Sequence, residues 1–279
     1  MSSTPNVKHW IPARFTLRGS DHRISGWPFA TIVLNQPLEN GTLFWDVCRR
    51  SNTVVAADGG ANRILDIKTA EDPDCVDVIC GDLDSIRPDV REYFANRGVK
   101  ILLDADQYST DLTKCLRYIR EEARMSTDFE GEGDALNSGS QKEYLDIAIF
   151  GGLGGRADQA FSQLHHLYVF AHEEPTVSKG DLYLITPESI VFLLEKGLNK
   201  IHTPLDTGFF KENVGIIPVA KPSVITTRGL EWDVTDWPTE FGTQISTSNH
   251  IKSDIIEVQT TERVLFTLEL DPSMAAPQT

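Results

Sequence analysis

The sequence predicts an α/β domain with a mostly parallel sheet and flanking helices, followed by an all-β sandwich domain. Between residues 29 and 171, short apolar runs alternate with segments of helical periodicity. That alternation is typical of a parallel sheet that is covered by helices. From about Asp181 onward, short β-rich runs follow one another between Gly, Pro and Asn turns, with no long helix among them. This second pattern is typical of a sandwich of two packed sheets.

The elements of the first domain can be assigned in chain order, as a Rossmann-like arrangement. The apolar runs that we interpret as buried strands lie at residues 29–34, 53–57, 76–80, 99–103 and 145–150. The segments between and after them predict helices at 42–50, 61–67, from Pro88 onward, from Thr110 to about Arg124, and at 157–171. Pro88 suits the first turn of a helix, where its missing N–H has no partner to lose, and Thr110 suits an N-cap.

The β-rich runs of the second domain lie at residues 182–186, 189–194, 214–220, 223–229, 244–249, 255–261 and 264–270. We expect an N-terminal extension (1–27), the α/β domain (28–187) and the sandwich (188–279), although the run at 182–186 could also be the last strand of the first domain. Residues 125–142 are rich in Gly, Ser and acidic side chains, which predicts an exposed, mobile polar insertion in the first domain.

Composition and charge exclude several kinds of partner. The 279 residues carry a formal net charge of −15 at pH 7, which argues against a nucleic-acid partner because phosphate backbones attract basic surfaces. No run approaches the roughly 20 apolar residues of a membrane helix, and the first residues lack the apolar core of a secretory signal. The four cysteines show no metal-site or disulfide spacing, so we interpret them as reduced core thiols of a cytoplasmic protein, over disulfides or zinc ligands.

Aspartates follow the ends of successive predicted strands, and this is the main clue to function. They are Asp58, Asp82, Asp84, Asp106, Asp111 and Asp158. The carboxyl ends of parallel strands meet at one edge of a sheet, where ligand crevices form. Each aspartate alone could instead be a helix N-cap. Capping explains the joint pattern poorly, so we expect several of these acids to converge on one site.

The Asp82–Leu83–Asp84 segment predicts a magnesium site. Residues i and i+2 of an extended segment project the same way, and two close carboxylates repel unless a cation lies between them. Mg²⁺ prefers oxygen ligands and usually takes one or two carboxylates, with water and substrate phosphates completing its shell. The alternative is that this segment is only a solvated turn.

A glycine-rich loop, Gly151–Arg156, lies between a predicted strand and a predicted helix. Such a loop lets backbone N–H groups approach a polyphosphate, and Arg156 would add donors. It matches neither a Walker A motif nor a dinucleotide fingerprint, and a tight turn explains it equally well. Lys114 could pair with Asp111 or reach a phosphate. His165 and His166 have no carboxylate or cysteine at the spacing of a metal site. We therefore expect both to pack against neighbouring side chains or to lie on the surface.

Taken together, these motifs resemble those of thiamine pyrophosphokinases. Their catalytic domain is matched by DGGAN (58–62), GDLDS (81–85), DQYSTDLTK (106–114) and GGLGGRADQ (151–159). Their thiamine-binding domain is matched by GLEWDVTDW (229–237) and FGTQISTSN (241–249). The match spans roughly Ala30 to Leu270. Tyr108 and Ser109 depart from the more polar or acidic residues that are common there, which weakens any role for those two positions.

The resemblance implies a homodimer with active sites shared between subunits, and transfer of a diphosphoryl group from ATP to the hydroxyl of thiamine. It implies the catalytic acids Asp58, Asp82, Asp84 and Asp111, with Mg²⁺ bound by Asp82, Asp84 and Asp111. The positions it assigns to the ATP side are Gly59, Gln107, Lys114, Arg156, Asp158 and Gln159. Those it assigns to thiamine are Trp232, Ser246 and Asn249. An aromatic face suits the cationic thiazolium ring, although Trp232 could instead be a core residue of the sandwich.

Two other functions are compatible with strand-end acids. One is a magnesium-dependent phosphohydrolase, in which water would be the acceptor; the DxDxT nucleophile motif of the best-known kind is absent from the sequence. The other is a non-catalytic sensor that binds thiamine and a nucleotide without turnover.

Overall fold

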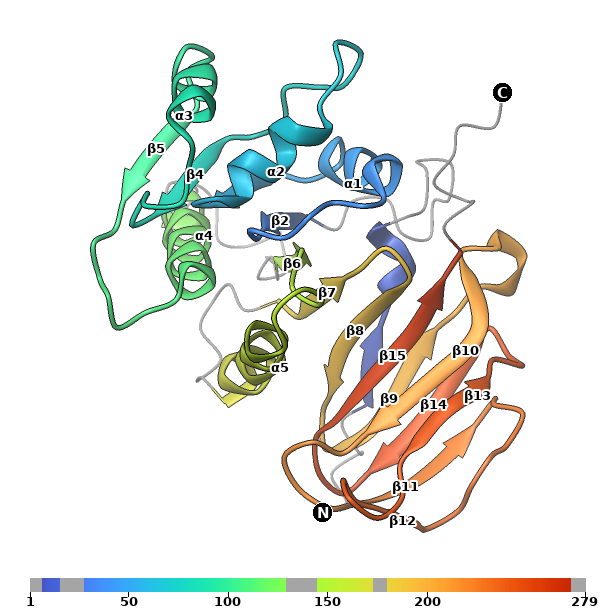
Figure 1. Ribbon diagram of the computed structural model, residues 1–279. Helices are drawn as coiled ribbons and strands as arrows, with labels where there is room; N and C mark the ends of the chain where they lie inside the picture. Colours follow the sequence, from blue (N-terminus) through green and yellow to red (C-terminus); the bar gives the residue numbers. More distant parts are fainter. Residues whose placement is uncertain (1–6, 16–27, 129–144, 173–179, 272–279) are drawn as a thin grey trace, which may run out of the picture. The chain divides into compact units, whose positions relative to one another are not determined.

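The computed structural model describes residues 7–15, 28–128, 145–172 and 180–271 (Figure 1). The chain divides into two compact units. One comprises residues 26–182, and the other combines residues 1–25 with residues 183–279. The expected domain limits of 1–27, 28–187 and 188–279 stay a prediction. Within the described ranges, none of the helices combines the length and the apolar character needed to cross a bilayer.

The first unit is built on parallel strands flanked by helices. Its strands lie in the order β6-β2-β3-β4-β5, and every neighbouring pair is parallel. Their bounds are β2 (Phe29–Val33), β3 (Thr53–Ala57), β4 (Val78–Gly81), β5 (Lys100–Leu103) and β6 (Asp146–Phe150). Every residue of β2, β4 and β6 is buried, as expected where helices cover both faces of a parallel sheet.

The helices of this unit follow the predicted order. They are α1 (Gly41–Cys48), α2 (Gly60–Ile67), α3 (Pro88–Ala95), α4 (Asp111–Asp128) and α5 (Ala157–His172). Helices α2 and α4 lie on opposite sides of the strands (Figure 1). Helix α4 extends beyond the end predicted at about Arg124, because neither Gly nor Pro occurs before Gly131 to stop it. The rest of the predicted polar insertion, from residue 129 on, lies outside the described residues.

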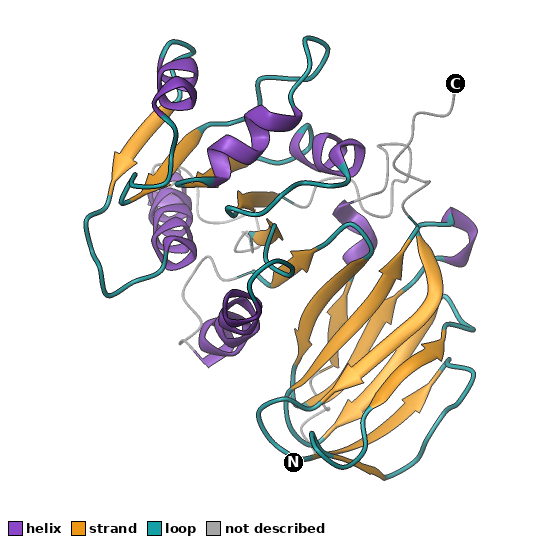
Figure 2. Cartoon of the chain, in the orientation of Figure 1, coloured by secondary structure: helices purple, strands orange, loops and turns teal. Residues whose placement is uncertain are grey.

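The second unit consists almost entirely of strands (Figure 2). One sheet has the order β1-β9-β14-β11-β12, and the other contains β13, β10, β15, β8 and β7 in that order. The bounds are β1 (Val7–Trp10), β7 (Leu182–Ile185), β8 (Ser189–Leu194), β9 (Gly197–His202), β10 (Phe210–Ile217), β11 (Ser223–Arg228), β12 (Trp237–Thr239), β13 (Ser246–His250), β14 (Ile255–Thr260) and β15 (Val264–Leu270). The predicted fold class, an α/β part followed by a β-rich part, is confirmed.

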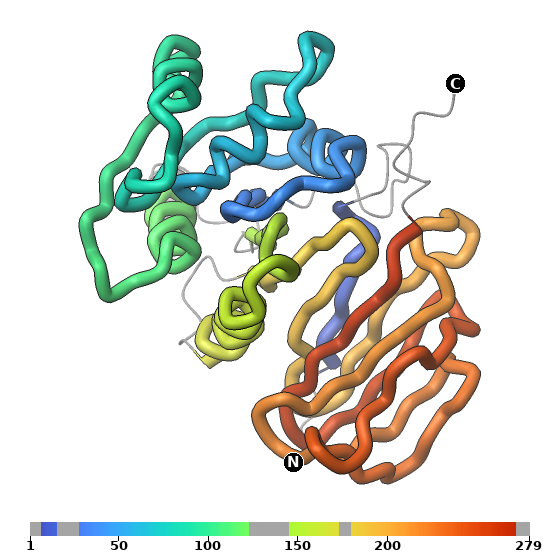
Figure 3. The backbone as a smooth tube through the Cα atoms, viewed as in Figure 1, coloured from blue at the N-terminus to red at the C-terminus, as the bar shows by residue number. Residues whose placement is uncertain are grey.

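The N-terminal segment joins this second unit. Strand β1 pairs in parallel with β9, and the two run side by side in Figure 3. Trp10 of β1 is 2 % exposed, and its ring centroid lies 5.0 Å from that of Phe192 on the opposite sheet. Its indole Nε1 donates a hydrogen bond of 2.9 Å to Oδ1 of Asn199. The N-terminal strand therefore supplies a core residue between the two sheets.

Strands β1, β9 and β12 were not predicted from the sequence, each for a physical reason. Strand β9 (GLNKIH) contains few apolar residues and no clear alternation of apolar and polar side chains. Strand β12 contains Pro238, which is tolerated because β12 is an edge strand. Strand β1 is only four residues long, and its partner is far away in the sequence.

We expect Trp10→Ala to destabilise the second unit by about 3–5 kcal/mol, because it removes a large buried aromatic side chain and leaves a cavity. Urea unfolding followed by circular dichroism measures this loss. Trp232→Ala is the matched control, because the Trp232 side chain is 54 % exposed and its removal should change the free energy of unfolding little. Equal losses for the two variants would contradict the assignment of Trp10 to the core.

Candidate active site

Three carboxylates converge at the carboxyl ends of the parallel strands. Asp58 follows β3, Asp82 follows β4, and Asp111 begins α4. One oxygen from each carboxylate lies within 4.8 Å of the other two, a spacing that could hold a metal ion. Asp58 is buried and the other two are half-buried. The arrangement follows from the topology, because the carboxyl ends of parallel strands meet at one edge of a sheet and the three acids follow β3, β4 and β5 along the chain.

Asp58 holds the loop that carries Asp82 and Asp84. Its carboxylate accepts hydrogen bonds from the backbone N–H groups of Ser85, at 2.9 Å, and Ile86, at 3.1 Å. The Asp58 backbone adopts a left-handed conformation with φ of 44°, which Asp tolerates better than most residues. Burial raises the pKa of Asp58 above its usual value, and the charge of Asp111 adds to the rise, whereas the Ser85 and Ile86 N–H groups oppose it.

Asn62, in the first turn of α2, also forms hydrogen bonds to this loop. Its Nδ2 donates to the carbonyl oxygen of Ser85 at 2.9 Å, and its Oδ1 accepts from the N–H of Arg87 at 3.0 Å. Asn62 is 6 % exposed. Asp58 and Asn62, which open and close the DGGAN motif, therefore fix the backbone of the loop through four buried or half-buried hydrogen bonds.

Close backbone approach explains two glycines of the matched motifs. A Cβ atom on Gly60 would overlap the carbonyl oxygen of Val33. A Cβ atom on Gly81 would lie 2.7 Å from Cβ of Asp58 and 3.1 Å from an Asp111 oxygen. A side chain at residue 81 would therefore push apart two of the three clustered acids.

Asp84 lies outside the three-carboxylate group. The Asp82–Leu83–Asp84 segment is not extended, because Leu83 has a left-handed backbone with φ of 61°. The Asp84 carboxylate accepts a hydrogen bond of 2.8 Å from the Ser85 hydroxyl, while Asp82 accepts one of 3.2 Å from Nε2 of Gln107. The group brought together is thus Asp58, Asp82 and Asp111, and the metal role of Asp84 stays a prediction.

Lys114 pairs with Asp111 inside the site. Its Nζ lies 3.1 Å from Oδ1 of Asp111, and its side chain is 2 % exposed. Burial disfavours the charged ammonium, but the carboxylates of Asp111, Asp82 and Asp104 outweigh that effect and raise the pKa of Lys114. A charged lysine is therefore held among the acids.

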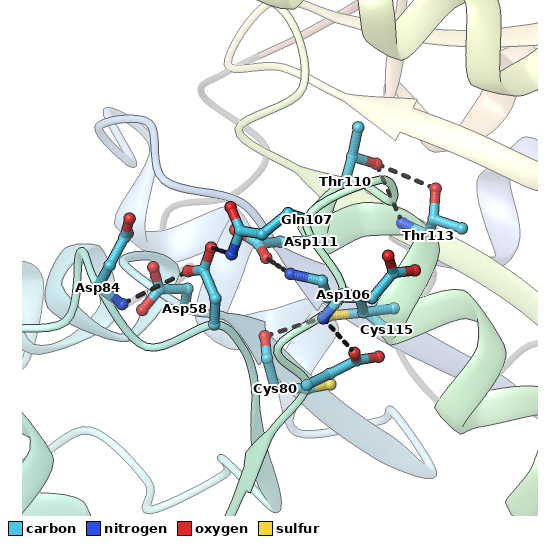
Figure 4. Close-up of polar contacts among 12 residues, drawn as sticks. Asp58, Cys80, Asp84, Asp106, Gln107, Thr110, Asp111, Thr113 and Cys115 are labelled. Carbon is cyan, nitrogen blue, oxygen red and sulfur yellow. Dashed lines mark hydrogen bonds and ion pairs between the residues drawn. The ribbon is translucent and has the colours of Figure 1, made fainter.

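His166 anchors the start of α4, a role that no local pattern in the sequence indicated. Its Nδ1 lies 2.6 Å from the carbonyl oxygen of Ser162, so Nδ1 carries the proton and donates. Its Nε2 lies 3.1 Å from each of the hydroxyl oxygens of Thr110 and Thr113. Thr110 also caps the helix by accepting from the Thr113 N–H at 3.2 Å (Figure 4). Helix α5 thereby fixes the turn that presents Asp111.

The glycine-rich loop follows β6, at the same sheet edge, and leads into α5. Arg156 and Asp158 form an exposed pair there, with distances of 3.1 and 2.6 Å between guanidinium nitrogens and carboxylate oxygens. This pairing lowers the pKa of Asp158. Gln159 is exposed in the first turn of α5. Three predicted ATP-side residues are thus neighbours at a helix N-terminus, where anions are favoured.

The predicted thiamine-side residues gather within the second unit. Trp232 is 54 % exposed, so the alternative that it is a core tryptophan is wrong. Asn249 is 7 % exposed and hydrogen-bonds to the backbone of Trp232. Ser246 is half-buried at the start of β13.

Two protein-family models match the chain. The model described as "Thiamin pyrophosphokinase, catalytic domain" matches residues 44–177, and the one described as "Thiamin pyrophosphokinase, vitamin B1 binding domain" matches residues 199–265. Among curated relatives, thiamine pyrophosphokinase 1 of Oryza sativa subsp. japonica is 34 % identical over 256 residues, covering 87 % of each chain. Thiamine pyrophosphokinase of Saccharomyces cerevisiae is 28 % identical, covering 86 % of this chain and 84 % of its own.

Solved structures agree with these relatives. The crystal structure of yeast thiamin pyrophosphokinase matches with a TM-score of 0.79 and 25 % identity, over 97 % of this chain and 93 % of its own. The thiamin pyrophosphokinase from Candida albicans matches with a TM-score of 0.76 and 25 % identity, over 97 % of this chain and 95 % of its own. The resemblance that the motifs indicated is confirmed across both units: the chain belongs to the thiamine pyrophosphokinase family.

Proposed function

We propose that this protein transfers the diphosphoryl group of ATP to the hydroxyl of thiamine, which yields thiamine diphosphate and AMP. The observation that carries the proposal is the group of three carboxylates at the ends of the parallel strands, in a chain whose two units match the two family models. In this reaction the thiamine hydroxyl oxygen bonds to the β-phosphorus of ATP, and the bond from that phosphorus to the departing AMP oxygen breaks. Such transfers depend mainly on positioning and charge neutralisation.

We propose Mg²⁺ as the metal, held by Asp82 and Asp111 beside Asp58. Clustered carboxylates suit this cation, because they are hard oxygen donors that repel one another without it. The raised pKa of Asp58 reflects that repulsion in part. When bound, Mg²⁺ would neutralise charge on the phosphate oxygens. Both carboxylate oxygens of Asp58 already accept hydrogen bonds from the loop, so its main task is to hold Asp82 in place.

The remaining residues would bind and orient the substrates. Lys114 is held charged beside Asp111, and Gln107 contacts Asp82, so both stand where phosphate oxygens would be received. Gly59, Arg156, Asp158 and Gln159 complete the proposed ATP side. On the thiamine side, the exposed indole of Trp232 offers an aromatic face for the thiazolium cation, with Ser246 and Asn249 nearby in the same unit.

We also propose a cytoplasmic homodimer with active sites shared between subunits. The free thiols of Cys48, Cys75, Cys80 and Cys115 suit a reducing compartment. Sedimentation equilibrium of the purified protein tests the dimer, and fractionation tests the compartment.

One assay separates the proposed transferase from its two rivals. We expect incubation with thiamine, ATP and Mg²⁺ to produce equal amounts of AMP and thiamine diphosphate, measured by chromatography. Inorganic phosphate released without thiamine would favour a phosphohydrolase instead. Binding of both ligands without product would favour a sensor.

We expect Asp82→Asn and Asp111→Asn each to lower kcat by on the order of 100-fold or more, because each removes a charge from the proposed metal site. Circular dichroism should show an intact fold. Asp89→Asn is the matched control, since Asp89 is an exposed acid in the first turn of α3. Near-normal turnover in both site variants would rule out the metal assignment, and Asp84→Asn in the same series tests the remaining predicted ligand.

We expect Asn62→Ala to raise the Mg²⁺ concentration that gives half-maximal activity, because the loop carrying Asp82 loses two of its four hydrogen bonds. The free energy of unfolding should fall by about 1–3 kcal/mol, since buried backbone groups lose their partners. Activity measured against Mg²⁺ concentration, with EDTA-treated protein as the starting point, gives the first quantity. Asn96→Ala, an exposed asparagine at the end of α3, is the control. An unchanged Mg²⁺ requirement would contradict the proposed role of the loop.

A further inference from the structure

The loop between β11 and β12 presents Trp232 on a rigid backbone. The Asp233 carboxylate accepts hydrogen bonds from the N–H groups of Gly229, at 3.0 Å, and Leu230, at 3.2 Å. The N–H of Val234 donates to the Thr227 hydroxyl at 3.0 Å, and the N–H of Thr227 donates to the Val234 carbonyl at 3.0 Å. These hydrogen bonds fix both ends of the loop, and none of them involves Trp232.

Asn249 fixes Trp232 itself. The backbone N–H of Trp232 donates to Asn249 Oδ1 at 3.1 Å, and Asn249 Nδ2 donates to the Trp232 carbonyl oxygen at 3.0 Å. The N–H of His250 also donates to Asn249 Oδ1, at 2.8 Å. An amide oxygen has two lone pairs, so Oδ1 is fully used within the protein. The Asn249 side chain thus pairs with one peptide unit on each side of Trp232 and has no acceptor left for a ligand.

A bulge in β13 explains why Asn249 points inward. The pairing of β13 with β10 shifts register, from Val214 opposite Asn249 to Ile216 opposite Ser246, so β13 contains one extra residue. Ser248 has a left-handed backbone with φ of 57° at this point. Thr247 and Ser248 are both exposed, and Asn249 is buried. Bulges re-aim a side chain in this way and are frequent beside functional sites.

The His250 ring packs against the indole ring of Trp232. Its ring centroid lies 4.8 Å from that of Trp232, with the planes tilted by 50°. Its Nδ1 lies 2.8 Å from a carboxylate oxygen of Glu231, which also pairs with Lys252 at 2.8 Å. The backbone of Trp232 is therefore hydrogen-bonded and its ring packs against His250, while 54 % of the residue stays exposed.

We propose that Asn249 is a positioning residue, which locks the Trp232 backbone so that the indole presents a preformed aromatic face to the thiazolium cation, and that Asn249 does not itself contact thiamine. This inference rests on the proposed function of the second unit in thiamine binding. A preformed face lowers the ordering cost of binding. Losing the lock should weaken thiamine binding by about 3- to 10-fold, given roughly 0.5–1.5 kcal/mol for each side chain that binding must immobilise.

A double-mutant cycle on the full chain tests the proposal. Thiamine binding is measured by calorimetry, and KM for thiamine, KM for ATP and kcat by product formation, for wild type, Asn249→Ala, Trp232→Ala and the double variant. We expect Asn249→Ala to raise the Kd and KM for thiamine about 3- to 10-fold, with KM for ATP and kcat little changed. The double variant should bind thiamine no more weakly than Trp232→Ala alone, because Asn249 acts through Trp232.

Two variants keep the test interpretable. Gln259→Ala removes an exposed amide side chain from β14 of the same unit and should match wild type. Asn249→Asp keeps the side-chain volume but places an oxygen against the Trp232 carbonyl in place of Nδ2, so it should weaken thiamine binding even if Asn249→Ala fails to fold.

The outcomes separate this inference from the proposed function. Additive losses in the double variant would show that Asn249 acts on thiamine binding independently of Trp232 and overturn the proposal. Normal thiamine binding by Asn249→Asp or by Trp232→Ala would also overturn it. If wild type binds thiamine but forms no thiamine diphosphate, the proposed activity fails while the binding cycle still decides the role of Asn249. If wild type does not bind thiamine, both proposals fail.

Discussion

The candidate site depends on the hydrogen bonds between the Asp58 carboxylate and the loop after β4. This buried carboxylate accepts hydrogen bonds from the backbone N–H groups of Ser85 and Ile86. Asn62 makes two more hydrogen bonds to the same loop. Burying a carboxylate is costly unless donors compensate it. Here the donors are backbone N–H groups of the loop that carries Asp82. The same two hydrogen bonds therefore stabilise the buried carboxylate and fix the position of the loop.

Several neighbouring residues also help to hold the three carboxylates in place. Gly60 and Gly81 lack side chains where one would overlap Val33 or push Asp58 from Asp111. His166 fixes the helix start that presents Asp111, and Lys114 balances part of the acidic charge from a buried position. Asp58 and Leu83 have left-handed backbones, and such strained conformations persist where the surroundings over-determine them. The acids converge because separate elements each restrict one of them.

Local pattern and one topological rule were enough to predict the strands and helices of the first unit and the convergence of acids after β3, β4 and β5. They do not reveal where a backbone leaves its regular path. Leu83 has a left-handed backbone next to Asp84, which lies outside the three-carboxylate group, and the bulge at Ser248 precedes the buried Asn249. Neither Leu83 nor Ser248 is a glycine, the residue that usually marks such a turn. Strand β1 and the contacts of His166 depend on partners far away in the sequence, which periodicity does not report.

The pairing of β1 with β9 has a consequence for how the chain folds as it is made. The first unit is a continuous stretch, residues 26–182, so all its strands are available before residues 183–279 of the second unit have been synthesised. Trp10, in contrast, must wait for Asn199, 189 positions later. Contacts of such long sequence separation form slowly, because chain entropy is lost before any contact is gained. Strand β1 is thus synthesised well before its partner strand β9 and pairs with it only late in folding.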